Sequence, residues 1–316
     1  MNIYSLLYFK EGTQAPVNLG KKSDIHDTYL ANAFLLQQSL KNSKYTHKII
    51  TNSKSRIQNF INRTGQIIDF IEVDFKWQIP INIKFHEAHY KLELYEMFSS
   101  GSFGDQIMLV DTDLIFSDNS EKLLNIISKN EENIFVFDVK GIELNKDDQK
   151  EHEKAINYLL SYKIKSFNWY GGEFIVATPS AFKEITKGIK KYLPFYLDSL
   201  NLLPHQGDEM LLNTVLNSEI KFEVIDINNF IKGNAIMRYW SAGTHLPQRR
   251  FAEIQDSHIL HFPADKPFLA KESFTKYNYK KFIKNYKKYL FFKAIFRSIF
   301  YFFRNSFKKK RYAPKS

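Results

Sequence analysis

The sequence predicts an α/β fold: one domain with a mostly parallel, mixed central sheet flanked by helices, followed by a basic, aromatic helical tail. Three observations predict it. Over about the first 120 residues, short apolar runs alternate with segments of helical periodicity, the pattern of a parallel, two-sided sheet. The run Ile107–Val110 is continuously apolar, which is typical of a strand buried on both faces. From Phe274 onward the chain has 14 Lys or Arg and no Asp or Glu.

Composition limits the classes of protein to consider. With 316 residues, 44% of them hydrophobic, the chain is long enough for a large globular core. The absence of cysteine excludes a disulfide scaffold, thiol catalysis and cysteine-ligated zinc. The net charge of +11 belongs to the end of the chain, because the residues before Phe274 have 31 Lys or Arg against 34 Asp or Glu. The start, MNIYSLLYFKEG, lacks a basic segment followed by a long apolar one, so we expect no secretory signal and a cytosolic setting.

The first part of the chain alternates between predicted strands and helices. Strands are expected where apolar and aromatic runs end at polar residues or glycine, over residues 3–9, 48–51, 67–73 and 105–110. Helices are expected where apolar residues recur near helical spacing, over residues 27–40, 55–62 and 85–98. In the last of these helices Ala88, Leu92, Tyr95 and Met97 mark the buried side.

The remainder of the body continues with both kinds of element. Further helices are expected over residues 121–128, 143–165, 181–192 and 208–216, and further strands over residues 133–139, 167–178 and 221–227. The helix at 143–165 is highly charged, so we expect it to cover the body. The segment Ser257–Phe268 closes the body, and we predict a domain over residues 1–272 and a tail over residues 273–316.

Two carboxylates follow the buried strand directly. Asp111 and Asp113 are two residues apart, so in an extended chain they project to the same side, where like charges repel. A divalent cation relieves that repulsion, and in open α/β sheets ligands bind beyond the carboxyl ends of the strands. Asp-x-Asp is also common in turns and helix caps, so the pair alone leaves a purely structural role open.

Four further stretches, with the Asp pair, resemble the bacterial A-type glycosyltransferases and most closely glycosyltransferase family 8. The helix before the Asp pair carries Lys91, matching a family Lys or Arg. A later aromatic and Gly stretch leads into a strand, as in Asn168–Val176. The motif HQGDEMLLN opens a helix with acidic residues, and His261 is followed by Lys266-Pro267-Phe268. The resemblance spans roughly residues 3–268 and implies an A-type glycosyltransferase domain with a nucleotide-sugar donor.

The chemistry of these residues fits that donor. A Mn²⁺ or Mg²⁺ ion on Asp111 and Asp113 would bridge the donor phosphates as a Lewis acid, and His261 would complete its coordination. Lys266 would place a positive charge against the phosphates. Each has a structural alternative: His261 as an ordinary buried histidine, Lys266 in a simple turn, and Lys91 on a solvated helix face.

Three other positions are expected to contact the donor. Gly171 and Gly172 have no side chain, so a sugar or phosphate can approach their backbone amides closely. Tyr8, at the end of the first strand, is a candidate for stacking on the base. The family usually has an acidic and an aromatic residue there, whereas this chain has an extra polar loop before Tyr29, which leaves the identity of the nucleotide open.

The catalytic candidates are Asp208, Glu209 and Glu173. Acidic residues at a helix start also offset the helix dipole, so Asp208 and Glu209 have a structural alternative. The family resemblance implies retention of anomeric configuration, with the leaving phosphate helping to deprotonate the acceptor. An inverting reaction, with one of these carboxylates as the base, stays open. Glu173 stands where the family usually continues from glycine with an apolar residue, which makes it a rival candidate.

The tail interleaves Lys and Arg with aromatic residues over Tyr277–Phe307. Its longest apolar part, Tyr289–Phe303, is interrupted by Lys293 and Arg297 and is shorter than the roughly 20 residues that a membrane span needs. A basic, aromatic helix at an anionic membrane surface fits better than a helix packed on the body, and no nucleic-acid module accompanies it. We therefore expect a cytoplasmic protein attached peripherally to the inner face of the cell membrane.

These features predict a metal-dependent hexosyltransferase that uses a nucleotide sugar, with UDP favoured, and extends a surface glycan such as lipopolysaccharide or capsule. The expected acceptor is a glycan or lipid-linked glycan. Two alternatives are a non-catalytic membrane-associated binding protein with a degenerate transferase body, and a sugar nucleotidyltransferase, which would consume a nucleoside triphosphate.

Overall fold

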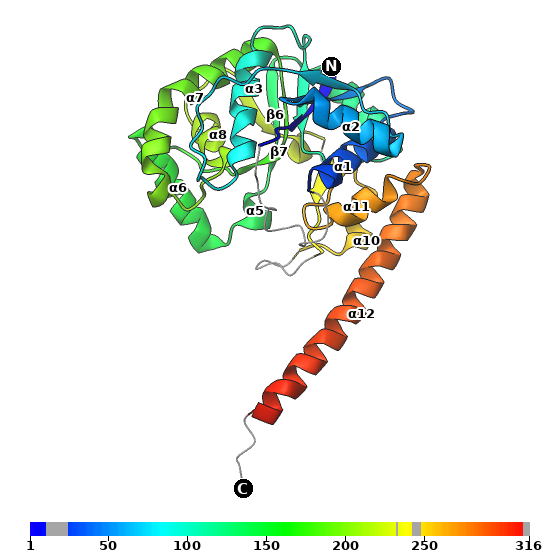
Figure 1. Cartoon of the computed structure of the whole chain (residues 1–316). Coiled ribbons are helices and arrows are strands. Elements are labelled where there is room, and N and C mark those ends of the chain that lie inside the picture. Colours follow the sequence, from blue (N-terminus) through cyan, green and yellow to red (C-terminus); the bar gives the residue numbers. More distant parts are fainter. Residues whose placement is uncertain (11–24, 232, 242–247, 312–316) are drawn as a thin grey trace. The chain divides into compact units, whose positions relative to one another are not determined.

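The computed structural model describes residues 1–10, 25–231, 233–241 and 248–311, with side chains up to residue 299. The chain forms two compact units, Met1–Thr275 and Lys276–Ser316. Figure 1 shows the elements of both units, coloured along the sequence.

A seven-stranded mixed sheet forms the centre of the first unit, with the order β3-β2-β1-β4-β7-β6-β8. Its strands are β1 (Asn2–Leu7), β2 (His47–Thr51), β3 (Phe70–Glu72), β4 (Ile107–Val110), β6 (Asn133–Asp138), β7 (Tyr170–Ala177) and β8 (Glu223–Asp226). Neighbouring strands are parallel except at β7, which is antiparallel to both β4 and β6. The predicted α/β fold with a mixed, mostly parallel sheet is therefore confirmed.

A second, three-stranded sheet has the order β5-β10-β9 and consists of β5 (Leu114–Phe116), β9 (Ile236–Arg238) and β10 (Ile259–His261). His261 on the central strand pairs with Leu114 on one side and with Arg238 on the other. The sequence pattern predicts neither β5 nor β9, because three residues are too few for strand alternation to become visible. This small sheet begins immediately after Asp113.

Helices flank the large sheet. They are α1 (Ile25–Ser39), α2 (Lys54–Thr64), α3 (Tyr90–Phe98), α4 (Ser120–Ile127), α5 (Lys140–Glu143), α6 (Lys146–Leu160), α7 (Pro179–Ser199), α8 (Asp208–Leu216), α9 (Ile227–Phe230), α10 (Phe251–Ile254) and α11 (Lys266–Glu272), with short 3₁₀ turns η1 (His86–His89) and η2 (Leu200–Leu202). Figure 1 shows α3, α6, α7 and α8 grouped on one side of this unit and α1, α2 and α11 on the other.

Three predicted elements differ from the structure. The helix predicted over 85–98 is split into a 3₁₀ turn and α3, since Phe85 has a positive φ of 56° just before the turn. The helix predicted over 143–165 is the shorter α6, because Asn145 caps its start by accepting hydrogen bonds from the amides of Asp147 and Asp148, and Ser161, with a φ of 59°, ends it. The strand predicted over 67–73 is only the three-residue edge strand β3.

The core lies around the centre of the large sheet. All four residues of β4 are buried, as the apolar run predicts, and they share a cluster with buried side chains of α3, α7 and α8. A second cluster joins Leu7 and Ile49 of the sheet to Leu30 of α1 and Phe60 of α2. The central strands are thus fixed by packing, so the residues that follow β4 are held in a defined position.

The second unit contains the helix α12 (Tyr279–Arg311) of 33 residues. The exposed side chains of Phe291, Phe292, Ile295, Phe296 and Ile299 recur at helical spacing and so share one face. Within the part of the chain that the structure describes, no helix combines the length and the hydrophobicity needed to cross a bilayer. The predicted aromatic tail also includes residues 300–307, whose side chains are not among those that the structure describes.

Candidate active site

The end of β4 lies beside the start of β7. Since these strands are antiparallel, Val110 pairs with Phe174, and the amide of Asp111 donates a hydrogen bond to the carbonyl of Glu173 at 3.1 Å. The carbonyl of Asp113 accepts from the amide of Phe262 at 3.1 Å, just after β10. The Asp-Thr-Asp turn is therefore held at one end by the large sheet and at the other by the small sheet.

This framework brings Asp111, Asp113 and His261 together, with one ligand atom of each lying within 4.8 Å of the others. Nε2 of His261 lies 3.4 Å from Oδ2 of Asp113, and both side chains are almost fully buried. The side chain of Asp111 is 33% exposed, which leaves one side of the cluster open to a ligand. Two carboxylates and an imidazole fit a divalent cation such as Mn²⁺.

Lys91 is buried behind this cluster rather than lying on a solvated helix face. Its Nζ donates to Oδ1 of Asp111 at 2.5 Å and to the carbonyl of Gly172 at 2.9 Å. Burial alone would lower the pKa of Lys91, but Asp111 and Asp208 outweigh it and hold that pKa above its usual range. The ammonium is therefore a permanent positive charge that ties α3 to β4 and β7.

Lys266 is the first residue of α11, and its Nζ donates to Oδ2 of Asp113 at 2.5 Å. Its pKa is raised because Asp113 outweighs the lowering effect of burial. The pKa of Asp113 is lowered in turn. Burial raises it, but the positive charge of Lys266 and the contact with His261 outweigh burial and keep the carboxylate ionised. Burial lowers the pKa of His261, but Asp113 and Glu173 outweigh that effect and raise the pKa above its usual value.

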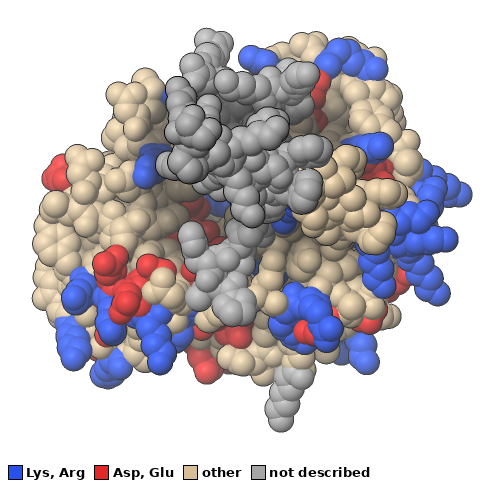
Figure 2. All heavy atoms as spheres, turned by 90° about the horizontal axis from the view of Figure 1, so that it is seen from below, with Lys and Arg blue, Asp and Glu red and all other residues tan. Residues whose placement is uncertain are grey.

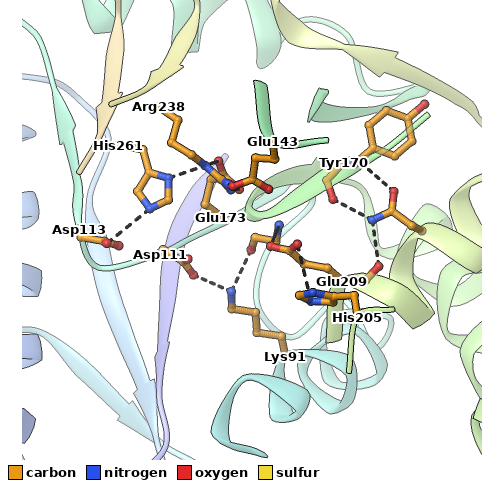
Figure 3. Close-up of polar contacts among 12 residues, drawn as sticks. Lys91, Asp111, Asp113, Glu143, Tyr170, Glu173, His205, Glu209, Arg238 and His261 are labelled. Carbon is orange, nitrogen blue, oxygen red and sulfur yellow. Dashed lines mark hydrogen bonds and ion pairs between the residues drawn. The ribbon is translucent and has the colours of Figure 1, made fainter. Parts of the chain in front are cut away.

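A buried ion network stands behind the imidazole of His261 (Figure 3). Glu173 is 1% exposed and accepts from Nε of Arg238 at 2.9 Å and from Nη2 at 2.6 Å. Its Oε1 also faces Nδ1 of His261 at 3.2 Å. Nη1 of Arg238 is paired with Glu143, so the guanidinium lies between two carboxylates. Burial lowers the pKa of Arg238 to about 10, and the group stays charged at neutral pH.

The two acidic residues at the start of α8 behave differently. Burial, reinforced by Asp208 and Glu173, raises the pKa of Glu209 to about 8. Burial also raises the pKa of Asp208, whose Oδ2 has no hydrogen-bond partner among the described residues. Oε1 of Glu209 accepts from the amide of Gly172 at 2.9 Å. Glu209 is therefore predominantly protonated at neutral pH, and burial favours the protonated form of Asp208 as well.

The space beside both glycines is filled by the chain itself. A Cβ on Gly171 would collide with the Glu173 and Arg238 side chains, and one on Gly172 would lie 3.0 Å from Glu209. These close approaches explain why glycine stands at both positions. The amide and the carbonyl of Gly172 are already engaged by Glu209 and Lys91, so a donor contact at Gly171 and Gly172 stays a prediction.

Tyr8 lies in an aromatic cluster at the end of β1. Its ring stacks on Tyr90 with centroids 3.8 Å apart and meets Phe75 edge to face at 5.4 Å. A T-shaped contact with His86 completes the cluster. Base stacking by Tyr8 stays a prediction, and residues 11–24 of the polar loop after β1 lie outside the described residues.

Sequence reasoning missed three members of the site: Glu143, His205 and Arg238. Nε2 of His205 lies 3.9 Å from Oε2 of Glu209, and burial lowers its pKa to about 4, which keeps the ring neutral. His205 was visible as the first residue of the HQGDE motif. Arg238 and Glu143 carry no local signal, since a single charged residue in an irregular segment or a charged helix is unremarkable.

Comparison with known proteins defines the fold. The galactosyltransferase LgtC, solved in complex with donor and acceptor sugar analogues, matches this chain with a TM-score of 0.51 at 14% sequence identity. The match covers 86% of this chain and 96% of LgtC. The chain therefore has the A-type glycosyltransferase fold, as the resemblance to family 8 predicts. No protein-family model matches the sequence, and no curated protein matches it.

Proposed function

We propose that this chain is a metal-dependent glycosyltransferase that moves a hexose from a nucleotide-sugar donor, with a UDP-sugar favoured, to a surface glycan such as lipopolysaccharide or capsule. The observation that carries the proposal is the cluster of Asp111, Asp113 and His261 at the carboxyl edge of β4, in an A-type glycosyltransferase fold. A Mn²⁺ or Mg²⁺ ion held there would supply Lewis-acid stabilisation of the diphosphate leaving group.

Lys266 supplies further positive charge. Its side chain is 12% exposed and its ammonium already has a carboxylate partner in Asp113, so it is positioned to contact a donor phosphate bound beside that carboxylate. Charge-assisted hydrogen bonds of this kind stabilise the negative charge that grows on the leaving diphosphate. Lys91 instead keeps Asp111 in place, since it is bound to both Asp111 and the backbone of β7.

Retention of anomeric configuration is favoured over inversion. A general base has to be unprotonated at the working pH, whereas burial raises the pKa of both Asp208 and Glu209, the latter to about 8. Protonated carboxyls donate hydrogen bonds to sugar hydroxyls. We therefore assign Asp208 and Glu209 to binding the transferred sugar, with the leaving diphosphate taking the acceptor proton. Glu173 is too deeply buried, and too fully paired, to act as the base.

The acceptor sugar is assigned to the ring of Phe85. That ring is 58% exposed and stacks on His205, with centroids 5.5 Å apart, and His205 in turn lies beside Glu209. A bulky residue rarely adopts the positive φ of 56° found at Phe85, and strained residues of this kind cluster at functional sites. An exposed aromatic face beside polar groups suits the apolar face of a sugar ring.

The helix α12 is assigned to an anionic membrane surface, which would bring a lipid-linked acceptor to the enzyme. Its exposed apolar face, defined by Phe291, Phe292, Ile295, Phe296 and Ile299, is accompanied by Lys293 and Arg297 at positions that fall on the opposite side of a helix. Aromatic rings favour the membrane interface, and Lys and Arg attract anionic lipids. Together these features support the proposal of a peripheral attachment to the inner face of the cell membrane.

A thermal-shift screen of nucleotide sugars with and without Mn²⁺ tests the function, since a bound ligand raises apparent stability. The donor that gives a Mn²⁺-dependent shift is then used to measure donor hydrolysis and transfer. We expect Asp113→Ala to abolish both. The matched control is Asp118→Ala, which removes an exposed carboxylate five residues away and should leave both activities intact.

The outcomes separate the alternatives. Metal-independent binding with no turnover would identify a non-catalytic binding protein, and release of pyrophosphate from a nucleoside triphosphate would identify a nucleotidyltransferase. Full activity of the Asp113→Ala variant in added Mn²⁺ would reject the metal role of that carboxylate.

A further inference from the structure

The imidazole of His261 is held between two carboxylates. Nε2 lies 3.4 Å from Oδ2 of Asp113, on the side of the proposed metal, and Nδ1 lies 3.2 Å from Oε1 of Glu173, on the far side. Figure 3 shows the ring between these two groups. All three side chains are at least nine-tenths buried, so solvent does not compete for the contacts.

Glu173 is itself fixed. Its two oxygens accept from Nε and Nη2 of Arg238, the forked geometry that holds a carboxylate in one orientation. The other side of the guanidinium is paired with Glu143. Arg238 and His261 are also direct neighbours in the pairing of β9 with β10, so the backbone sets the distance between them. A Cβ at position 171 would collide with the side chains of Glu173 and Arg238, and the glycine there leaves room for their contact.

The chemistry of the carboxylate sets the state of the ring. Both oxygens of Glu173 accept hydrogen bonds from Arg238, so Glu173 presents an acceptor to the imidazole and the Nδ1 that faces it carries a hydrogen. In the neutral ring the lone pair is then on Nε2, directed toward Asp113 and the proposed cation. Metal-binding histidines in general donate their second N–H to such a partner, which fixes both the tautomer and the angle of the ring.

Resting on the proposed function, we propose that Glu173, held by Arg238, is the positioning residue that makes His261 a metal ligand. Glu173 also fixes the opposite ligand through its backbone, because its carbonyl accepts from the amide of Asp111. One residue of β7 therefore orients both sides of the cluster. The glutamate that replaces the apolar residue usual in the resembled family thus acts on the metal site rather than as a catalytic base.

Metal affinity, not turnover, is the decisive measurement. The variants are Glu173→Gln and Arg238→Lys, each made alone and with His261→Ala, and Mn²⁺ affinity is measured by electron paramagnetic resonance of the free ion. We expect Glu173→Gln to weaken Mn²⁺ binding about 10- to 100-fold, the range found for partners of metal-binding histidines. Arg238→Lys keeps the charge but loses the fork, so a smaller loss is expected.

The double variants show whether Glu173 acts through His261 or binds Mn²⁺ directly. If Glu173 acts through His261, Glu173→Gln has no further effect on Mn²⁺ affinity once His261 is alanine. A loss of similar size in both backgrounds would overturn the proposal and make Glu173 a ligand in its own right or a purely structural residue. The control is Glu93→Gln, which changes a buried glutamate that accepts from the amides of Lys76 and Trp77.

Two further readouts keep the outcome unambiguous. Thermal unfolding without metal shows whether each variant is folded. If Glu173→Gln does not fold, the same comparison of Mn²⁺ affinity is made with Arg238→Lys, with and without His261→Ala. A wild-type chain that binds no Mn²⁺ would remove the proposed function together with this inference. A wild-type chain that binds Mn²⁺ and transfers sugar, with Glu173→Gln binding Mn²⁺ equally well, would remove this inference alone.

Discussion

The ammonium of Lys266 lies 2.5 Å from Oδ2 of Asp113, the same oxygen that faces Nε2 of His261 at 3.4 Å. Nζ of Lys266 also donates to the carbonyl of Pro263 and lies 5.8 Å from the ring centroid of Tyr29. Lys266 thus already engages one oxygen of a carboxylate that is proposed to bind the cation. Under the proposed function, a bound cation would compete with this ammonium for Asp113, and a donor diphosphate would favour the release of Lys266 from the carboxylate.

Replacing Lys266 by methionine should therefore change two affinities in opposite directions. Mn²⁺ affinity without nucleotide should rise, because the competing ammonium is gone. UDP affinity in the presence of Mn²⁺ should fall at least about 10-fold, since a hydrogen bond between charged groups contributes roughly 1.5–3 kcal/mol. Isothermal titration calorimetry with Mn²⁺, and then with UDP at saturating Mn²⁺, measures both.

Lys271→Met is the control for that pair of titrations. It removes an exposed positive charge from the same helix α11 and should leave both affinities unchanged. A Lys266→Met variant with weaker Mn²⁺ binding would mean that the lysine supports the cation site instead of competing for it.

The pairing of Asp111 with Asp113 could be predicted because its signal is local. A buried apolar strand followed by Asp-x-Asp is visible within about ten residues, and strand geometry places both carboxylates together. The resemblance to a known family then added His261 and Lys266. The sheet class followed from the alternation of short apolar runs with helical periodicity, which packing did not override.

Arg238 and Glu143 could not be predicted, because their roles exist only in the folded chain. Arg238 meets Glu173, which is 65 residues away, and it does so from the three-residue strand β9. The positive φ of Phe85, just before the 3₁₀ turn, is equally invisible in sequence, since a phenylalanine carries no signal for that conformation. The sequence does indicate Glu173 as a catalytic candidate, but its burial and its pairing with Arg238, which support the positioning role proposed above, appear only in the folded chain.

Stability should fall with rising pH because of Glu209. Its pKa is raised from 4.5 to about 8, so between those values the unfolded chain has released a proton that the folded chain retains. The folded state then binds more protons, and its free energy of unfolding decreases as pH rises. Glu209→Gln is neutral in both states and removes this contribution, whereas the raised pKa of Asp208 acts in the same direction and remains.

Urea unfolding of the metal-free protein at pH 5 and pH 8 measures the effect. We expect the wild type to lose about 2 kcal/mol more than Glu209→Gln, less than the full shift implies because the side chain is 20% exposed. Glu151→Gln, which changes an exposed glutamate on α6, should behave like the wild type. An equal pH dependence in wild type and Glu209→Gln would contradict a raised pKa at that residue.

Two variants of Phe85 should differ in stability but lose acceptor binding alike. At a positive φ glycine is favoured over other residues, so Phe85→Gly should be more stable than Phe85→Ala by about 1 kcal/mol. Both variants lose the ring, so both should raise KM for the acceptor while donor hydrolysis stays near the wild-type rate. Thermal unfolding and steady-state kinetics measure the two effects.

Ser161→Gly is the matched control for Phe85, because Ser161 has a φ of 59° at the end of α6. It should gain stability for the same backbone reason and leave the acceptor KM unchanged. An unchanged acceptor KM in Phe85→Ala would reject the assignment of the acceptor to this ring.

Binding of the chain to lipid vesicles should depend on both faces of α12. With phosphatidylglycerol vesicles at about 0.1 M salt, each Lys or Arg near the surface contributes about 1 kcal/mol, so Lys293→Gln with Arg297→Gln should weaken binding at least about 10-fold. Phe292→Ser with Phe296→Ser, which removes rings that are 55% and 68% exposed, should weaken it at any salt concentration.

Co-sedimentation with vesicles of phosphatidylglycerol or phosphatidylcholine measures these effects. Lys122→Gln with Lys129→Gln removes the same charge from exposed positions in and just after α4, so it controls for net charge alone. If that control lost as much binding as the Lys293 and Arg297 variant, attraction would come from overall charge rather than from α12. Equal binding to both lipids by the wild type would exclude an anionic surface as the partner, since only phosphatidylglycerol carries the negative charge that Lys and Arg recognise.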